Sequence, residues 1–149
     1  MRITYEQIRQ SEEINTYIAQ ADASLLALGF TEHSFAHVAR CAEMASGLLR
    51  DLGYSDREVE LAKIAGYMHD IGNVVNRHDH AISGATMAFR ILDNMGMEPA
   101  DVAAVITAIG HHDDKTAFPV NAVAAALILA DKTDVRRSRV RNRDTIRFD

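Results

Sequence analysis

The sequence predicts an all-α protein, a compact single-domain helical bundle of about six or more helices. Three observations lead to this prediction. Apolar residues recur at helical spacing through most of the chain, no stretch alternates apolar and polar residues as a half-buried strand does, and both prolines lie at expected helix boundaries. With 149 residues, 48% hydrophobic and 25% charged, the chain has the size and composition of one globular domain, and we expect residues 1–149 to form it.

Six helices are expected, and several begin or end at residues that favour a helix boundary. They cover residues 4–29, 31–52, 55–69, 80–95, 99–111 and 121–134. Thr4 with Gln7 and Ser55 with Glu58 are capping boxes, in which the first side chain bonds a backbone N–H of the first turn. Gly53 follows the second expected helix, where glycine is common because it tolerates left-handed backbone.

Composition and charge narrow the classes of partner. The longest apolar run, residues 122–130, is far too short to span a membrane, and residues 1–10 hold no apolar segment typical of a secretion signal. Cys41 is the only cysteine, so no disulfide framework exists, and its apolar neighbours predict a place in the core. A net charge of -5 argues against nucleic-acid binding, although six of the thirteen arginines lie in residues 136–149. We therefore expect a cytoplasmic protein whose partners are neither membranes nor nucleic acids.

The seven histidines are concentrated near expected helix ends. His33 and His37 fall on the second expected helix, and the others lie at or near the ends of later helices or in a loop: His69, His78, His80, His111 and His112. Imidazole and carboxylate groups brought together from several helix ends suit a divalent transition metal ion. A lone histidine is more often a structural residue, but the adjacent pairs His69–Asp70 and His111–His112 favour a metal site.

Three segments carry a family resemblance. They are HVARCA from His37, YMHDIGN around His69–Asp70, and LILADKTD around Asp131. In order and spacing they resemble the motif of the HD-domain metal-dependent phosphohydrolase superfamily, over a motif core of residues 31–134. The resemblance implies that His37, His69, Asp70 and Asp131 bind one metal ion. His33 competes with His37 as the first ligand because HS also starts a form of this motif, but the arginine three residues after His37 favours His37.

A branch of this superfamily binds two metal ions, and its additional ligands have counterparts in this chain. The resemblance implies that His80, His111 and His112 hold a second ion and that Asp70 bridges the two. The ions would be divalent transition metals such as Fe, Mn, Zn, Ni or Co. Such a pair clamps an attacking hydroxide and the phosphoryl oxygens. The alternative is a site with one ion, in which these three histidines hold substrate phosphate.

Several basic residues are candidates for binding the phosphate of the substrate. The resemblance gives Asp70 and His69 a catalytic as well as a metal-binding role, and Lys132, next to Asp131, is the first candidate for binding phosphate. Arg77 is the second. The third is the arginine-rich C-terminal segment, residues 136–149, because guanidinium groups bind phosphate oxygens in bidentate fashion. Its arginines include Arg136, Arg137, Arg139, Arg141 and Arg143. The same segment could equally be a solvated tail or contact a partner.

Five further residues have open roles. His78 and Asp79 either orient His80 or are solvated loop residues. Asp134, one helical turn beyond Asp131, would shape the edge of the site, and it is, with His78, a weak candidate for a general base. Asp113 and Asp114 would lie at the same edge.

The substrate class is only partly indicated. Ala117–Pro119 stand where two-metal cyclic-dinucleotide phosphodiesterases have Gly-Tyr-Pro, which argues against that substrate. We expect hydrolysis of a phosphomonoester or phosphodiester of a nucleotide or another small phosphorylated metabolite, through metal-bound hydroxide. Two other functions stay open: a di-iron oxygenase-type enzyme, and a metal-containing regulatory or ligand-binding module without turnover. Assembly into a homo-oligomer also stays open.

Overall fold

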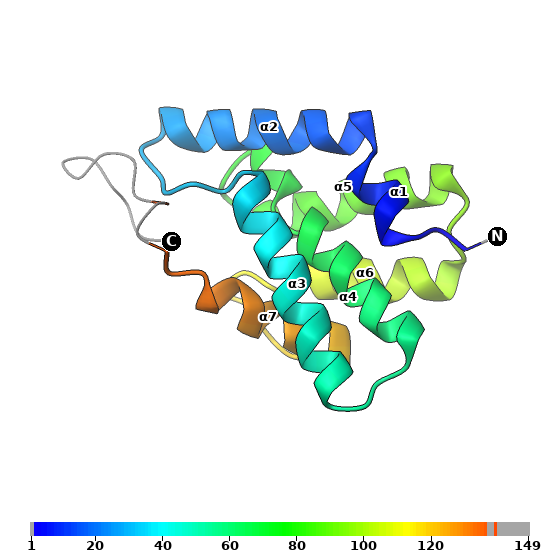
Figure 1. The fold of residues 1–149 in the computed structure, drawn as a ribbon. Coiled ribbons are helices and arrows are strands. Elements are labelled where there is room, and N and C mark those ends of the chain that lie inside the picture. Colours follow the sequence, from blue (N-terminus) through cyan, green and yellow to red (C-terminus); the bar gives the residue numbers. More distant parts are fainter. Residues whose placement is uncertain (1, 137–138, 140–149) are drawn as a thin grey trace.

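The computed structural model describes residues 2–136 and residue 139 of the chain. Within these residues the chain forms seven α-helices and one 3-10 turn, with no strand, and the predicted all-α fold is confirmed (Figure 1). The elements are α1 Tyr5–Arg9, α2 Glu12–Ala27, α3 Phe35–Asp51, α4 Asp56–Met68, η1 Ile71–Val74, α5 His80–Met95, α6 Pro99–Gly110 and α7 Ala122–Thr133. None of the described helices is long and apolar enough to cross a membrane.

The two N-terminal helices differ from the expectation of one helix over residues 4–29. The chain breaks at Ser11, whose backbone is extended and whose hydroxyl accepts a hydrogen bond from the N–H of Ile14 at 3.2 Å. A serine that caps the following turn offers the backbone an alternative to helix continuation. Apolar periodicity alone could not reveal this break, because both helices bury residues on the same side, such as Ile8 and Ile14.

The second expected helix begins later than predicted. It was expected from Thr31, but α3 starts at Phe35 after Ser34, whose backbone N–H donates to the carboxylate of Glu32 at 2.7 Å. The prediction placed His33 on this helix together with His37. In the structure His33 lies in the loop before α3. The later helices begin and end within about one or two residues of the expected positions.

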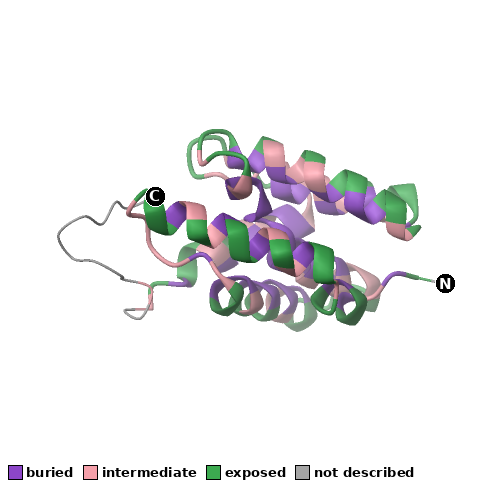
Figure 2. Ribbon diagram, turned by 90° about the horizontal axis from the view of Figure 1, so that it is seen from above, coloured by how far each residue is buried: buried purple, intermediate pink, exposed green. Residues whose placement is uncertain are grey.

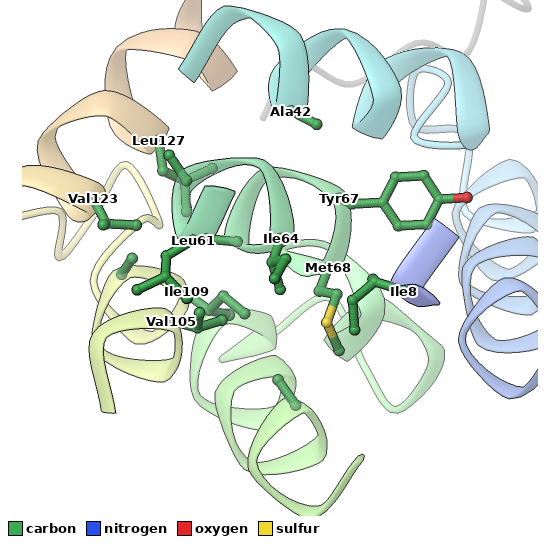
Figure 3. Packing of buried hydrophobic residues seen from close by; sticks show 14 of the residues in the cluster. Ile8, Ala42, Leu61, Ile64, Tyr67, Met68, Val105, Ile109, Val123 and Leu127 are labelled. Atoms are coloured by element: carbon green, nitrogen blue, oxygen red, sulfur yellow. The ribbon is translucent and has the colours of Figure 1, made fainter. Parts of the chain in front are cut away.

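Helix α4 lies at the centre of the hydrophobic core. It packs against α3, α6, α7 and the short α1. Leu61 points toward Ile109 of α6 and Leu127 of α7, while Met68 reaches toward Ile8 of α1 (Figure 3). Figure 2 shows the same arrangement as burial, with buried residues on the inner sides of the helices and exposed residues on the outer sides. The end of α4 is thereby fixed by packing on several sides.

Two glycines bring chain segments into close contact beside the end of α4. A Cβ atom at Gly66 would lie 2.8 Å from the backbone of Ala42, so α3 and α4 approach more closely than any larger residue allows. At Gly72, in η1, a Cβ atom would overlap the carbonyl of His80, which begins α5. Glycine at these positions thus lets α3 pack directly on the end of α4, and α5 on the turn that follows it.

Candidate metal centre

The ends or first turns of five helices bring six polar side chains into one cluster. His37 lies on the first turn of α3, His69 and Asp70 directly follow α4, and the others come from three later elements: His80 from the start of α5, His112 from just beyond α6, and Asp131 from the last turn of α7. Because α4 contacts α3, α6 and α7, the residues after its end meet residues from all three. The described chain therefore assembles the cluster around His69 and Asp70.

The first half of the cluster joins two imidazoles to two carboxylates. Nε2 of His37 lies 3.3 Å from Oδ2 of Asp70 and 3.1 Å from Oδ1 of Asp131. Nε2 of His69 lies 3.2 Å and 3.4 Å from the same two oxygens. Atoms that bind one transition metal ion at about 2.0–2.2 Å lie at such separations from each other. These four residues can hold one ion.

The second half of the cluster lies on the other oxygen of Asp70. Its Oδ1 is 3.8 Å from Nε2 of His80 and 3.7 Å from Nε2 of His112. The two Nε2 atoms are themselves 3.2 Å apart. Asp70 thus turns one oxygen toward each half of the cluster, which is the arrangement of a carboxylate that bridges two ions.

The Nδ1 atoms fix which ring nitrogen faces the cluster. Nδ1 of His69, His80 and His112 lies 2.7 Å, 3.0 Å and 2.6 Å from the backbone carbonyls of Gly66, Arg77 and Ile109. A carbonyl only accepts, so each Nδ1 donates its proton and a neutral ring has a lone pair on Nε2. Two lone pairs would then face each other between His80 and His112, an arrangement that a cation stabilises.

Two buried atoms lack a hydrogen-bond partner among the described residues: Nε2 of His69 and Oδ2 of Asp70. They lie close together, but their geometry is not that of a hydrogen bond. An unsatisfied buried polar atom costs about 1–3 kcal/mol, so two such atoms side by side in a fold's interior need an explanation. A metal ion between them would bind both, and the residues therefore fit the metal that the motif implies.

The electrostatics of the two halves differ. Burial opposes the charged form of His69, but the carboxylates of Asp70 and Asp131 outweigh it and raise the pKa of His69 well above its usual range. Burial likewise opposes ionisation of Asp70, yet the charge of His69 holds its pKa well below the usual range. His80 lies further from carboxylates, and its burial lowers its pKa to about 4. At neutral pH His80 is therefore neutral, as a metal ligand must be.

His37 and His33 have different places. His37 belongs to the cluster and is fully buried. His33 is also buried, with Nδ1 2.7 Å from the carbonyl of Thr31, and its ring meets that of His37 edge to face at 5.3 Å between centroids. It lines the hollow outside the cluster rather than joining the donor set. The geometry thus favours His37 as the first ligand.

The structure does not bring His111 or His78 into the cluster. His111 follows the end of α6, its Nδ1 lies 2.8 Å from the carbonyl of Thr107, and it lines a second, adjoining hollow. His78 is exposed and pairs at 3.2 Å with Asp79, which is exposed too. The carbonyl of Arg77, not these two side chains, orients His80.

Cys41 and Asp134 both contact the ring of His37, which the sequence did not predict. Cys41 is buried, as expected for a core residue, but its sulfur lies 3.8 Å and 3.7 Å from the two ring nitrogens of His37. The sulfur, one nitrogen of His37, one nitrogen of His69 and one oxygen of Asp131 all lie within 4.8 Å of one another, so Cys41 is a further residue that could contact an ion there. Asp134 bonds Nδ1 of His37 at 2.8 Å. The contact between Cys41 and His37 could have been predicted, because the two residues are four positions apart on one helix. Nothing in the sequence indicates the contact between Asp134 and His37.

A hollow of about 340 Å³ opens over the cluster. Its lining includes Asp70, Asp131, His33 and four basic residues: Arg77, Lys132, Arg136 and Arg139. Lys132 is exposed and lies 3.8 Å from a carboxylate oxygen of Asp114. Arg77 donates to the side-chain oxygen of Asn73 at 3.1 Å and lies over the ring of Phe30. Arg137, Arg141 and Arg143 lie outside the described residues.

Comparison with known proteins places this cluster in a family. The family model described as HD domain matches residues 34–136, which contain every donor of the cluster. The chain belongs to the HD-domain family. This confirms the family resemblance that His37, His69–Asp70 and Asp131 carry in the sequence.

Two similar proteins can be named for this HD-domain chain. It is 24% identical over 162 aligned residues to the uncharacterized protein MJ1020 of Methanocaldococcus jannaschii, an alignment that covers 94% of this chain and 62% of that protein. The chain thus spans less than two thirds of that relative's length. It is also similar, at 29% identity and a TM-score of 0.63, to the crystal structure of a predicted HD superfamily hydrolase from an uncultured Thermotogales bacterium. That similarity covers 85% of this chain and 71% of the other.

Proposed function

We propose that this HD-domain protein is a metal-dependent hydrolase that cleaves a phosphomonoester or phosphodiester of a nucleotide or another small phosphorylated metabolite. The observation that carries the proposal is the position of Asp70, with one carboxylate oxygen toward His37 and His69 and the other toward His80 and His112. A carboxylate between two donor sets suits two divalent ions. The similarity to a protein named as a predicted HD superfamily hydrolase supports the reaction class.

The proposal assigns ligands to both ions. His37, His69, Asp70 and Asp131 would hold the first, and Asp70, His80 and His112 the second. His111 stays a predicted additional ligand of the second ion. When bound, divalent ions of this kind lower the pKa of a coordinated water and polarise phosphoryl oxygens. The metals that suit imidazole with carboxylate are Fe, Mn, Zn, Ni and Co.

The residues around the hollow would bind and orient the substrate. Lys132 and Arg77 lie on its wall and carry positive charge that complements a phosphate. Asp134 does not suit the role of a general base. Burial raises the pKa of its carboxyl, but hydrogen bonds from Arg136 and His37 outweigh this and hold that pKa well below the usual range. His78 is exposed and absent from the lining of the hollow over the cluster, so it does not suit that role either.

Metal analysis combined with a substrate panel tests the proposal. Protein purified without chelator is expected to hold two ions per chain and, with Mn²⁺, to release phosphate from nucleoside monophosphates or to cleave p-nitrophenyl and bis-p-nitrophenyl phosphate. His112→Ala should lower the metal content to one ion and reduce kcat steeply. His111→Ala decides whether the seventh predicted ligand contributes.

Several results would contradict parts of the proposal. A constant content of one ion in wild type and in His112→Ala would exclude the second site, and a loss mainly in KM would then favour phosphate binding by these histidines. Full metal content without hydrolysis of any phosphoester would favour a regulatory module. Iron-dependent substrate oxidation in air without phosphate release would favour an oxygenase.

A further inference from the structure

We propose that Asp134 is a positioning residue that holds His37 in the orientation needed to bind metal, and that Arg136 holds Asp134 in turn. This inference rests on the proposed metal binding, but it does not depend on which bond the protein hydrolyses. It gives a role to part of the arginine-rich C-terminal segment that substrate binding leaves unexplained.

His37 is held differently from the other three imidazoles of the cluster. Those of His69, His80 and His112 donate Nδ1–H to carbonyls three residues earlier in the chain. His37 instead bonds a carboxylate 97 residues away, at 2.8 Å from Nδ1 to Oδ2 of Asp134. This bond turns Nε2 toward the oxygens of Asp70 and Asp131. A carboxylate on the far nitrogen of a metal-binding imidazole fixes its tautomer and makes it a stronger ligand.

Asp134 is itself firmly held. It is 4% exposed, and Arg136 donates to both of its carboxylate oxygens, from Nε to Oδ1 at 2.6 Å and from Nη2 to Oδ2 at 2.8 Å. Arg40 approaches Oδ1 at 3.6 Å. Paired bonds from a guanidinium fork restrict both the position and the plane of a carboxylate. The side chain of Asp134 therefore keeps one direction toward His37.

A second contact ties this segment to the loop that precedes α3. The Nε of Arg139 donates to the carbonyl of Glu32 at 2.7 Å, and the N–H of Glu32 donates to the carbonyl of Arg139 at 2.9 Å. Nη1 of Arg139 donates to the carbonyl of Asp134 at 2.8 Å. Figure 1 shows the end of α7 and the loop between α2 and α3 on the same side of the molecule. We call Glu32, Asp134, Arg136 and Arg139 the clasp.

The clasp joins the segment after α7 to the loop from which α3 starts. His37 lies on the first turn of that helix, so both its backbone and its ring are fixed by the clasp. The first ion would be held by His37, His69, Asp70 and Asp131. The segment beyond α7 would therefore support the site of that ion. His80 and His112, which would hold the second ion, make no hydrogen bond to the clasp among the described residues.

Titration of metal-free protein with Co²⁺ tests the inference. Asp134→Ala should weaken binding of the first ion by about 10- to 100-fold and change the visible absorption spectrum of bound Co²⁺, because loss of a carboxylate behind a ligating imidazole has effects of this size. Asp134→Asn keeps an acceptor without the charge and should fall between wild type and Asp134→Ala. Arg136→Ala should weaken binding in the same direction but less. The second ion should keep its affinity in all three.

A matched control is available at the surface. Arg90 donates to Glu13 in an exposed pair between α5 and α2, and both Glu13→Gln and Arg90→Ala should leave Co²⁺ affinity and spectrum unchanged. A purely structural role for Asp134 would lower the thermal stability of the metal-free protein without altering the spectrum at saturating Co²⁺.

The outcomes separate this inference from the proposed function. A folded Asp134→Ala protein with wild-type affinity and spectrum would overturn it; if that variant fails to fold, unchanged Co²⁺ binding in both Asp134→Asn and Arg136→Ala would do so. Wild-type protein that binds Co²⁺ but hydrolyses no phosphoester would remove the proposed function and leave the clasp intact. Wild-type protein that binds no Co²⁺ would overturn both.

Discussion

Asp70 connects the two halves of the cluster because each of its oxygens faces a different pair of histidines. The sequence could predict this role only by family resemblance, since an HD dipeptide has no geometry of its own. The resemblance implied that His111 and His112 both bind metal, although two successive residues at a helix end point in different directions. Which of the two faces the cluster depends on how the end of α6 packs, and this the sequence could not predict. The direction of Asp134 toward His37 was also beyond prediction, since it depends on how α7 docks on α3.

Replacement of Asp70 should therefore affect both ions at once. We expect Asp70→Ala to lose both metals and activity while its far-ultraviolet circular dichroism stays helical, because a core of this size folds without a metal. His37→Ala should lose mainly the first ion, and His33→Ala should have a smaller effect than His37→Ala. Elemental analysis of the three proteins measures this. Stoichiometric metal in Asp70→Ala would disprove the bridging role, and a larger loss in His33→Ala would identify His33 as the ligand.

Metal affinity should rise with pH. Burial opposes protonation of His37, but hydrogen bonds with Asp131, Asp134 and Asp70 outweigh it and raise its pKa above the usual range, as carboxylates also do for His69. Because the raised pKa values keep protons on these rings in the metal-free protein, an ion must displace them. Calorimetric titrations with Mn²⁺ at pH 6 and pH 8, in buffers of different ionisation enthalpy, should show tighter binding at the higher pH and proton release. Equal affinity at both values would contradict the prediction.

At the scale of elements, the close approach of α3 and α4 decides where His37 meets His69. Apolar periodicity and capping residues predicted the bounds of the later helices well, because each lies between clear boundary signals such as Pro99 or Gly96. They failed at Ser11, whose hydroxyl caps α2 and interrupts an otherwise continuous pattern, and at Ser34, which precedes α3 without a side-chain capping bond. Local capping competes with periodicity at such points, and only tertiary packing decides between them.

A methyl group at Gly66 should separate α3 from α4. Since a Cβ there would lie 2.8 Å from the backbone of Ala42, we expect Gly66→Ala to lower the free energy of unfolding by about 1–3 kcal/mol and to weaken Co²⁺ binding. Gly47→Ala on α3 is the control: a Cβ there meets nothing within 4 Å, so it should be neutral or stabilising by up to about 1 kcal/mol. Urea unfolding and Co²⁺ titration of both variants measure this. Equal stability of the two proteins would show that the helices can move apart freely.

For the whole molecule, the cluster depends on helices that pack on α4 from several directions. The family resemblance implied that ligands from several helices would meet, and α3, α6 and α7 do pack on α4. Distances, the adjoining hollows and the clasp could not be predicted, because they arise from packing between segments far apart in the chain. The net charge does not show where the charged residues lie either. A value of -5 could not predict that four basic residues line one hollow.

Metal removal should lower the stability of the entire fold. Ions that bind only the native cluster stabilise it by mass action, about 2.7 kcal/mol for one site at a free concentration 100 times Kd. Thermal unfolding of wild type with Mn²⁺ should therefore occur at a higher temperature than with a chelator. Asp70→Ala should show no such difference. A wild-type Tm that is indifferent to both metal and chelator would argue that native and unfolded chains bind the ion equally.

The bond between His37 and Asp134 spans 97 residues of chain, nearly two thirds of its length. During synthesis, a ribosome would release α3 and α4 well before α7, so an early intermediate has His37, His69 and Asp70 but neither Asp131 nor Asp134. Closing so long a loop costs entropy that only later contacts repay. Binding of an ion at the first half of the cluster would therefore follow the docking of the last helix, and the metal content of that first site would report how many chains in a cell have completed that step.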